Sequence, residues 1–269
     1  MTVQLATVWL SLTLAHLLGD FVLQRTPVVR GKAVGSKLAF AEHGAVHLLC
    51  LVFSFIFFVG PQVLAGSTFA VLAALVIAHL GLDVAKETTN AKTPQQARRW
   101  PFLVDQALHF LLITIAAVMI APLPSRAVLA AGWAEVSNQV LVVGVGYLAV
   151  VFAAGYVNGV LLQPFSSQLG RWADDGNGNG REEKDGGSVG LARAGMSIGV
   201  LERFLIMTAV LAGSPTGVGL VVAAKSVFRF EDAKRGRHAA EYFLIGTFLS
   251  VSEAVIGGVV VGRLLAFYG

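Results

Sequence analysis

The chain has 269 residues, of which 55% are apolar and 13% charged, and its mean hydropathy is +0.72. An ordinary soluble domain carries about 25% charged residues, so this composition excludes a soluble globular domain. The formal net charge of +4 is spread over several loops, which argues against nucleic acid as a partner. The single cysteine, Cys50, excludes an internal disulfide and argues against a thiolate metal site.

Several apolar stretches, about 20 residues each, are long enough to cross a bilayer as helices. All eight prolines lie between these stretches or at their ends, as expected because proline disrupts a helix interior. The seventh stretch is short and charged, so it could be a partial or interfacial helix. The sequence therefore predicts an all-α, polytopic membrane protein with about eight membrane segments, at residues 3–24, 38–60, 63–86, 102–121, 136–162, 192–213, 216–230 and 240–267.

Basic residues predict how these segments are oriented. Seventeen of the 20 Lys and Arg residues lie in four alternate loops, 25–37, 86–99, 163–193 and 225–237. Because cytoplasmic loops of membrane proteins carry an excess of Lys and Arg, these loops are predicted to be cytoplasmic. We therefore expect a protein of the cytoplasmic membrane with both termini outside and with membrane lipids as neighbours.

The predicted segments fall into four parts. Residues 1–121 form a membrane domain made of two similar hairpins, and 122–162 form a connecting transmembrane helix. Residues 163–191, rich in Gly, Asn and charge, are expected to be a flexible cytoplasmic loop. Residues 192–269 supply the C-terminal membrane helices.

A pattern of polar residues occurs twice in the first part. A His and an Asp, four residues apart in an apolar run, recur 63 residues later with the same spacing. Each copy is followed by a second polar pair, and these second pairs are offset by 62 residues. An offset kept to within one residue predicts a duplicated helical hairpin. The four pairs are His16/Asp20, His43/His47, His79/Asp83 and Asp105/His109.

These pairs are predicted to meet in one buried metal site. Residues four apart lie on one face of a helix, and the predicted topology puts all four pairs at a similar depth near the cytoplasmic surface. Five imidazoles and three carboxylates suit Zn, Mn or Fe better than Ca or Mg. We expect one or two divalent ions, held between facing helices as in di-metal bundles. Interhelical hydrogen bonding and a proton or ion relay are the alternatives.

Other polar residues adjoin the predicted ligands. Glu42 and Lys86 are candidate catalytic residues, and Glu42 could act as a base or orient a histidine. Gln24 and Gln106 are candidates for supporting roles. Each of these residues is equally consistent with an ordinary polar position at the membrane interface.

The C-terminal part has charges inside its apolar helices. Arg203, Lys225 and Arg229 could bind a phosphate or another anionic group of a substrate. Alternatively, Glu202 and Glu241 could neutralise these cations and tie the helices together.

Four stretches within about the first 120 residues resemble a family of bacterial membrane proteins catalogued as domain of unknown function 3307. Two later stretches are similar to the C-terminal extension of longer members. The resemblance implies a membrane location and a role for the paired residues, and it implies no reaction. The first four stretches are AHLLGDFVLQ (15–24), EHGAVH (42–47), AHLGLDVAK (78–86) and DQALH (105–109), and the later two are IGVLERFLI (198–206) and EYFLIGTFLS (241–250).

The favoured hypothesis is a metal-dependent membrane hydrolase. Two metals would generate a hydroxide nucleophile that attacks a lipid-linked phosphate or a similar substrate from the cytoplasmic leaflet. A divalent-metal or proton-coupled transporter and a non-catalytic structural or partner protein are the alternatives. A di-iron oxidase also stays open, although such sites use more Glu. The helices that carry the pairs contain no internal proline, which favours an enzyme over a transporter modestly.

Overall fold

The computed structural model describes residues 3–60, 66–122, 131–163, 186–233 and 237–268. The described residues form helices and turns and contain no strand, which confirms the predicted all-α fold. The chain divides into two compact units. The first comprises Met1–Leu148 with Leu265–Gly269, and the second comprises Ala149–Leu264.

Among the described residues, six helical stretches are long and apolar enough to cross a membrane. They correspond to the first five and the last of the predicted segments. The sixth and seventh predicted segments lie in helices α8 (Gly186–Leu211) and α9 (Pro215–Ala233), and α9 contains only a shorter apolar stretch. A total of eight spans therefore stays a prediction. The six stretches are Gln4–Val22, Lys37–Phe58, Ser67–Lys92, Arg99–Ile120, Val136–Gln163 and Leu244–Tyr268.

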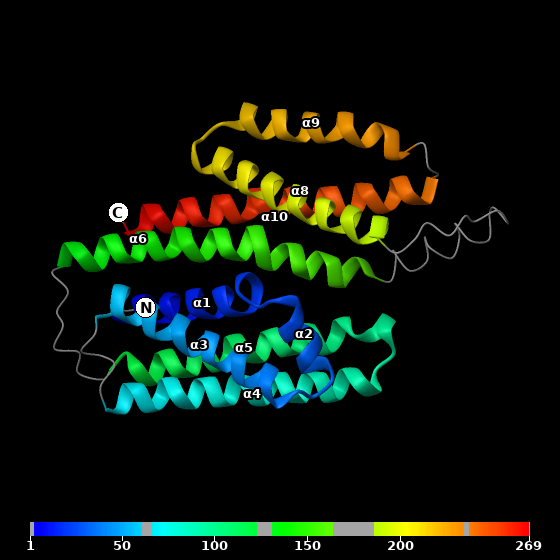
Figure 1. The fold of residues 1–269 in the computed structure, drawn as a ribbon. Helices are drawn as coiled ribbons and strands as arrows, with labels where there is room; N and C mark the ends of the chain where they lie inside the picture. The colour runs from blue at the N-terminus through cyan, green and yellow to red at the C-terminus, as the bar shows by residue number, and fades with distance from the viewer. Residues whose placement is uncertain (1–2, 61–65, 123–130, 164–185, 234–236, 269) are drawn as a thin grey trace. The chain divides into compact units, whose positions relative to one another are not determined.

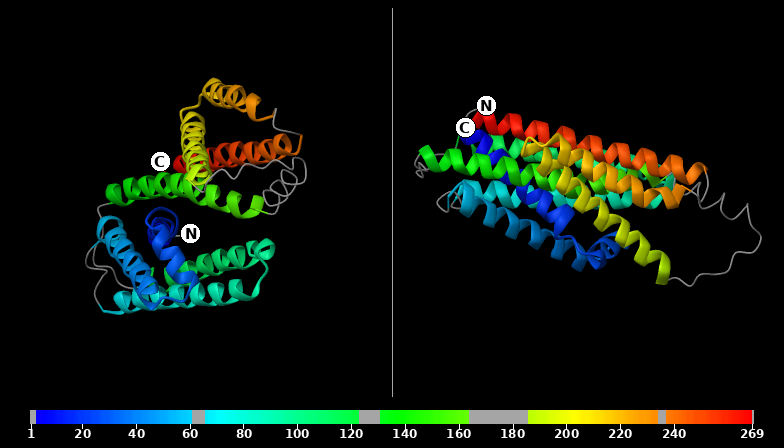
Figure 2. Two further views of the ribbon diagram at one scale, coloured as in Figure 1. Left: turned by 45° about the vertical axis from the view of Figure 1, so that its right-hand side comes forward. Right: turned by 90° about the horizontal axis from the view of Figure 1, so that it is seen from above.

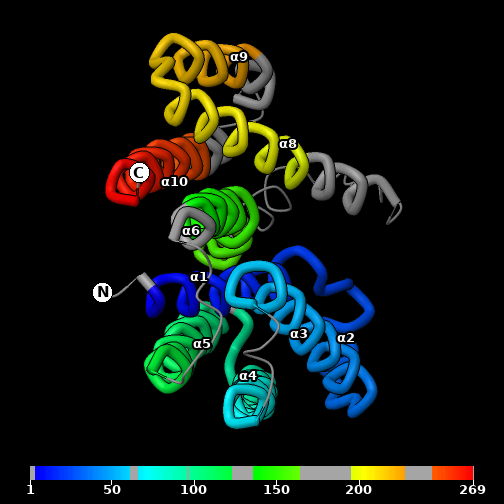
Figure 3. The backbone as a smooth tube through the Cα atoms, turned by 90° about the vertical axis from the view of Figure 1, so that its left-hand side faces the viewer, coloured from blue at the N-terminus to red at the C-terminus, as the bar shows by residue number. Residues whose placement is uncertain are grey.

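The first unit is built around a four-helix bundle (Figures 1 and 3). Helix α1 packs against α3 and α5, and α4 closes the bundle by packing against the same two helices. Helix α6 packs on the outer side of α1. The bounds of these helices are Val3–Leu17 (α1), Lys37–Phe58 (α3), Ser67–Lys92 (α4), Arg99–Ile120 (α5) and Ala131–Tyr147 (α6).

The centre of this bundle is apolar at one end and polar at the other. The apolar part contains fully buried Leu12, Phe55 and Leu72. A few polar side chains link helices within it, such as the Thr7 hydroxyl, which donates to Asn138 Oδ1 at 2.8 Å between α1 and α6. Such interhelical contacts contribute about 0.6–1.7 kcal/mol each in a membrane. The packing therefore fixes how α1 presents its last turn to the other three helices.

The stretch between the first two membrane segments, predicted as a loop, contains a short helix, α2 (Thr26–Ala33). Pro27 lies in its first turn, where its missing N–H costs no hydrogen bond. Gly35, with φ 75°, provides the left-handed conformation that ends α2 before Ser36 caps α3. Helix α2 packs against α3 and α4, so it covers the end of the bundle where the paired polar residues lie.

The second unit begins at Ala149, within the π-helical turn η4 (Leu148–Ala153). It also contains the helical residues 154–163 and helices α8, α9 and α10 (Arg237–Tyr268). Helices α8 and α9 form an antiparallel hairpin (Figure 2). Glycines allow close helix contacts here, since a Cβ on Gly258 would lie 2.8 Å from Val210 Cγ1.

Candidate metal centre

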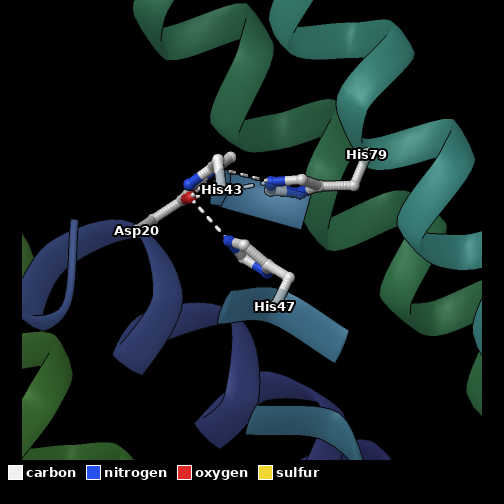
Figure 4. Close-up of side chains that lie close together, drawn as sticks. All are labelled: Asp20, His43, His47 and His79. Carbon is white, nitrogen blue, oxygen red and sulfur yellow. Dashed lines mark hydrogen bonds and ion pairs between the residues drawn. The ribbon is translucent and has the colours of Figure 1, made fainter. Parts of the chain in front are cut away.

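Four side chains from three membrane helices converge in the first unit (Figure 4). Asp20 follows α1, His43 and His47 come from α3, and His79 comes from α4. One potential ligand atom of each lies within 4.8 Å of the others. The three histidines are buried and Asp20 is nearly so. We call these four residues the Asp–His cluster.

The three imidazoles of the cluster all face one carboxylate oxygen. Oδ1 of Asp20 lies 3.0 Å from Nε2 of His47, 3.2 Å from Nε2 of His43 and 3.6 Å from Nε2 of His79. The Nε2 atoms of His43 and His79 are 3.1 Å apart. A carboxylate oxygen has two lone pairs, so three N–H donors could not all be well satisfied by it. Four ligands around a tetrahedral zinc ion, at 2.0–2.1 Å, would lie about 3.3 Å from one another. Four of the six separations in the cluster, at 3.0–3.6 Å, are close to that value, and all six are within 4.8 Å, so these residues could hold one divalent ion.

The backbone around Asp20 departs from a regular α-helix. Residues Leu18–Val22 form the π-helical turn η1, a rare conformation that is frequent at functional sites. Gly19 lies within it, and a Cβ at this position would be 2.5 Å from His47 Nε2. Only glycine therefore lets the end of α1 approach His47 closely enough for Asp20 to join the cluster.

A second group of possible ligands, formed by His79, Asp83 and His109, overlaps the first. It is less suited to an ion because its atoms already have partners. Nδ1 of His109 lies 2.9 Å from the backbone oxygen of Asp105, and its Nε2 lies 3.4 Å from that of His79. Asp83 accepts from a lysine at each of its two oxygens. His79, moreover, has one Nε2 and cannot use it for both groups.

Two lysines neutralise the acidic residues beside the cluster. Nζ of Lys32 donates to Oδ2 of Asp83 at 2.6 Å, and Nζ of Lys86 donates to Oδ1 at 2.9 Å. Lys86 also lies 3.5 Å from Oδ2 of Asp105. Three carboxylates and two ammonium groups leave a formal charge of −1 with neutral histidines. One divalent ion changes that charge to +1, whereas two would change it to +3. Since uncompensated charge is costly in a low-dielectric interior, the residues fit one ion better than two.

Lys32 was not among the sequence-predicted site residues, although its side chain is only 3% exposed. The sequence places it in a basic stretch that reads as a solvated loop. Pro27 just after Thr26, followed by Gly35 and Ser36, is the pattern of a helix start and stop that could have predicted α2. No local pattern, however, links Lys32 to Asp83, because they are 51 positions apart.

The other predicted site residues divide into those beside the cluster and those away from it. Nε2 of Gln24 lies 3.3 Å from Nδ1 of His43 and can orient that imidazole. Gln106 donates to Asp105 at 3.1 Å. Glu42 instead forms an ion pair with Arg25 at an exposed position, which leaves no observed contact with the cluster among the described residues.

His16 occupies an unusual position for a predicted ligand. Its Nδ1 lies 3.8 Å from Oδ2 of Asp20. Its Nε2 is buried and has no hydrogen-bond partner among the described residues. The ring borders a cavity of about 20 Å³, together with the imidazoles of His47, His79 and His109. The rest of the cavity wall is aliphatic and consists of Leu12, Leu51, Leu75, Val76, Leu112 and Ile113.

The predicted anion-binding residues belong to the second unit. The Arg203 guanidinium is buried and donates to the backbone oxygen of Val151 at 2.8 and 3.1 Å and to Ser250 at 3.3 Å. Lys225 forms an ion pair with Glu202. These contacts favour the alternative in which the charges tie helices together. Arg229 lies in α9, but its side chain is outside the described part of the structure, as are the side chain of Glu241 and the predicted loop at 164–185.

A comparison of the chain with known protein families supports the family resemblance predicted from the sequence. Residues 8–135 match the family described as a protein of unknown function (DUF3307), which confirms the predicted resemblance for this part of the chain. The matched region contains every residue of the Asp–His cluster. No curated protein and no solved structure matches the chain.

Proposed function

We propose that this chain, whose residues 8–135 match the DUF3307 family, holds one divalent ion on the Asp–His cluster and acts as a metal-dependent hydrolase in the membrane. The observation that carries the proposal is the convergence of three imidazole nitrogens on Oδ1 of Asp20, at 3.0–3.6 Å. Nitrogen and oxygen ligands of this kind suit Zn, Mn or Fe. The formal charge around the cluster supports one ion rather than two.

The proposed substrate is a lipid-linked phosphate or a similar anionic ester. A bound divalent ion activates water and stabilises charge on a phosphoryl group. In the reaction, the water oxygen bonds to phosphorus, the bond from phosphorus to the lipid oxygen breaks, and a proton from water passes to that oxygen. Of the two lysines beside the cluster, Lys86 is the more exposed, at 15% against 3% for Lys32, so it is the one that a substrate could reach, although Asp83 and Asp105 already share its charge.

Elemental analysis of the detergent-purified protein tests the metal centre. We expect close to one Zn, Mn or Fe per chain in the parent protein and less than one tenth of that in His43→Ala. Ser54→Ala is the matched control, because Ser54 is also a buried polar residue of α3 but bonds to the Ser11 backbone oxygen. An absence of bound metal after metal-replete expression, or full occupancy in a folded His43→Ala variant, would contradict the centre.

Phosphate release from lipid phosphates in mixed micelles tests the reaction. The metal-loaded parent protein should release phosphate, and protein treated with a chelator should lose at least 90% of that rate and regain it with metal. Ser54→Ala should keep the rate and His43→Ala should not. A fully metal-loaded protein with no hydrolysis of lipid phosphates would contradict the enzyme proposal and leave the metal centre intact.

Transport of the ion is the second candidate function, and the geometry of Asp20 favours it. Asp20 lies in a π-helical turn that is followed by a break before α2, and interrupted helices commonly hold transported ions. A transporter would move the ion into proteoliposomes without hydrolysing lipid phosphates. Uptake lost in His43→Ala and kept in Ser54→Ala would support transport, whereas uptake equal to that of empty vesicles would exclude it.

A further inference from the structure

A small cavity lies beside the Asp–His cluster, and its lining includes His16, which is not one of the four residues of the cluster. The imidazoles of His16, His47, His79 and His109 all line it. Its volume of about 20 Å³ suits a single water molecule, since a water needs about 10–15 Å³ of such space. A water in this position would therefore touch two residues of the cluster and the ring of His16.

His16 is the polar group that this cavity leaves unsatisfied. Its ring is only 4% exposed, and its Nε2 has no hydrogen-bond partner among the described residues. A buried nitrogen without a partner carries a free-energy cost that a hydrogen bond to water removes. Nδ1 of the same ring lies 3.8 Å from Oδ2 of Asp20, beyond hydrogen-bond distance, so the imidazole lies beside the cluster without being bonded to it.

The wall of the cavity limits which molecule can occupy it. Six aliphatic side chains, among them Leu75 and Leu112, surround the four imidazoles. The volume of about 20 Å³ is too small for a polyatomic anion such as phosphate. The occupant therefore has to be as small as water or hydroxide and needs to form its hydrogen bond with His16.

We infer that His16 is not a metal ligand but the residue that holds a single water or hydroxide in this cavity, as a fifth, non-protein ligand that the ion would take beside the four residues of the Asp–His cluster. This inference rests on the proposed metal centre. The bound water or hydroxide would be the nucleophile of the proposed hydrolysis. The water would lie in a cavity whose wall is otherwise aliphatic. In this role His16 positions the water and does not bind the ion.

Anion binding to the cobalt-substituted full-length protein tests the inference, because cobalt(II) bands in the visible spectrum respond to a change of ligand. Fluoride is about the size of water, and thiocyanate is much larger. We expect fluoride to shift the bands of the parent protein and thiocyanate to leave them unchanged. Leu75→Ala should admit thiocyanate, whereas Leu141→Ala, a buried leucine that does not line the cavity, should still exclude it.

His16→Ala separates the proposed role from that of a ligand. The variant should keep cobalt at the parent stoichiometry and bind fluoride about tenfold more weakly, as expected when one hydrogen bond is lost. Loss of cobalt from a folded His16→Ala variant would overturn the inference and make His16 a ligand. Cobalt bands in the parent that ignore fluoride would also overturn it, while the metal centre would stand. Failure of the parent to bind cobalt at all would instead contradict the proposed function.

Discussion

Asp20 reaches the three imidazoles because the chain before it adopts a π-helical turn and because Gly19 has no side chain. The close approach at Gly19 is specific to the first of the two similar sequence stretches. The glycine of the second stretch, Gly81, lies one residue earlier relative to its Asp, and a Cβ there would meet no atom within 4 Å. Two glycines in similar sequences therefore have different structural roles.

Alanine substitutions at these two glycines should have opposite effects. Gly19→Ala adds a Cβ that would lie 2.5 Å from His47 Nε2, so we expect at least a tenfold loss of metal affinity. Gly81→Ala should keep the parent affinity and stabilise α4 by up to about 1 kcal/mol, since alanine favours a helix over glycine. Metal competition with a chromophoric chelator measures both affinities. Equal affinities of the two variants would show that close packing at Gly19 does not position the cluster.

The short helix α2 joins the bundle through a buried charge. Lys32 extends from α2 to Oδ2 of Asp83 on α4, and both side chains are almost completely buried. Removing one partner of a buried ion pair is costly because the other charge stays in a low-dielectric environment. Lys86 still compensates Asp83 when Lys32 is absent, so the cost should lie at the low end of the usual range.

Lys32→Met should therefore lower the free energy of unfolding by about 3 kcal/mol. Arg30→Met is its control, because Arg30 is an exposed residue of the same helix and its loss should change stability by less than about 0.5 kcal/mol. Denaturant unfolding of both variants in the same detergent gives the comparison. Equal stabilities would mean that Lys32 does not anchor α2.

The molecule as a whole consists of two compact units. In the second unit, Arg203 donates to the backbone oxygen of Val151, which lies in the π-helical turn η4. A π-helical turn disturbs the regular helical hydrogen bonds, so a buried guanidinium is a suitable partner for this oxygen. The arrangement gives Arg203 a structural role within its own unit.

Arg203→Met should thus destabilise the protein by about 1–3 kcal/mol and leave its metal content unchanged. Arg263→Met, at an exposed position of the same unit, should change neither property. Thermal unfolding and elemental analysis of the two variants test this. A variant at Arg203 with unchanged stability and a raised KM for a lipid phosphate would instead support the anion-binding role predicted from the sequence.

Local spacing predicts much of the site, while long-range packing determines the rest. The four-residue spacing within each pair puts His43 and His47 on one face of a helix, so their convergence follows from the sequence. The same spacing does not distinguish His16, whose Nε2 faces no protein partner among the described residues, from His79, whose Nε2 joins the cluster. The π-helical turn at Asp20 is a second feature that no sequence pattern predicts.

Features of the fold that depend on local sequence can likewise be predicted, whereas those that depend on contacts between distant residues cannot. The apolar stretches predict the all-α fold and six of the membrane segments, because hydrophobic length is a local property. Helix α2 and the burial of Lys32 depend on contacts between residues far apart in the chain, and the basic composition of this stretch conceals them. The internal repeat, the orientation in the membrane and the location of the termini stay predictions.

X-ray absorption at the metal edge of the purified protein tests the central claim, a single ion held by Asp20, His43, His47 and His79. We expect nitrogen and oxygen ligands only, at about 2.0–2.1 Å for zinc, with outer-shell scattering from three imidazoles. Scattering from a second metal at about 3.5–4 Å would contradict a single ion. A shell with fewer than two imidazoles would contradict the assignment of the ligands.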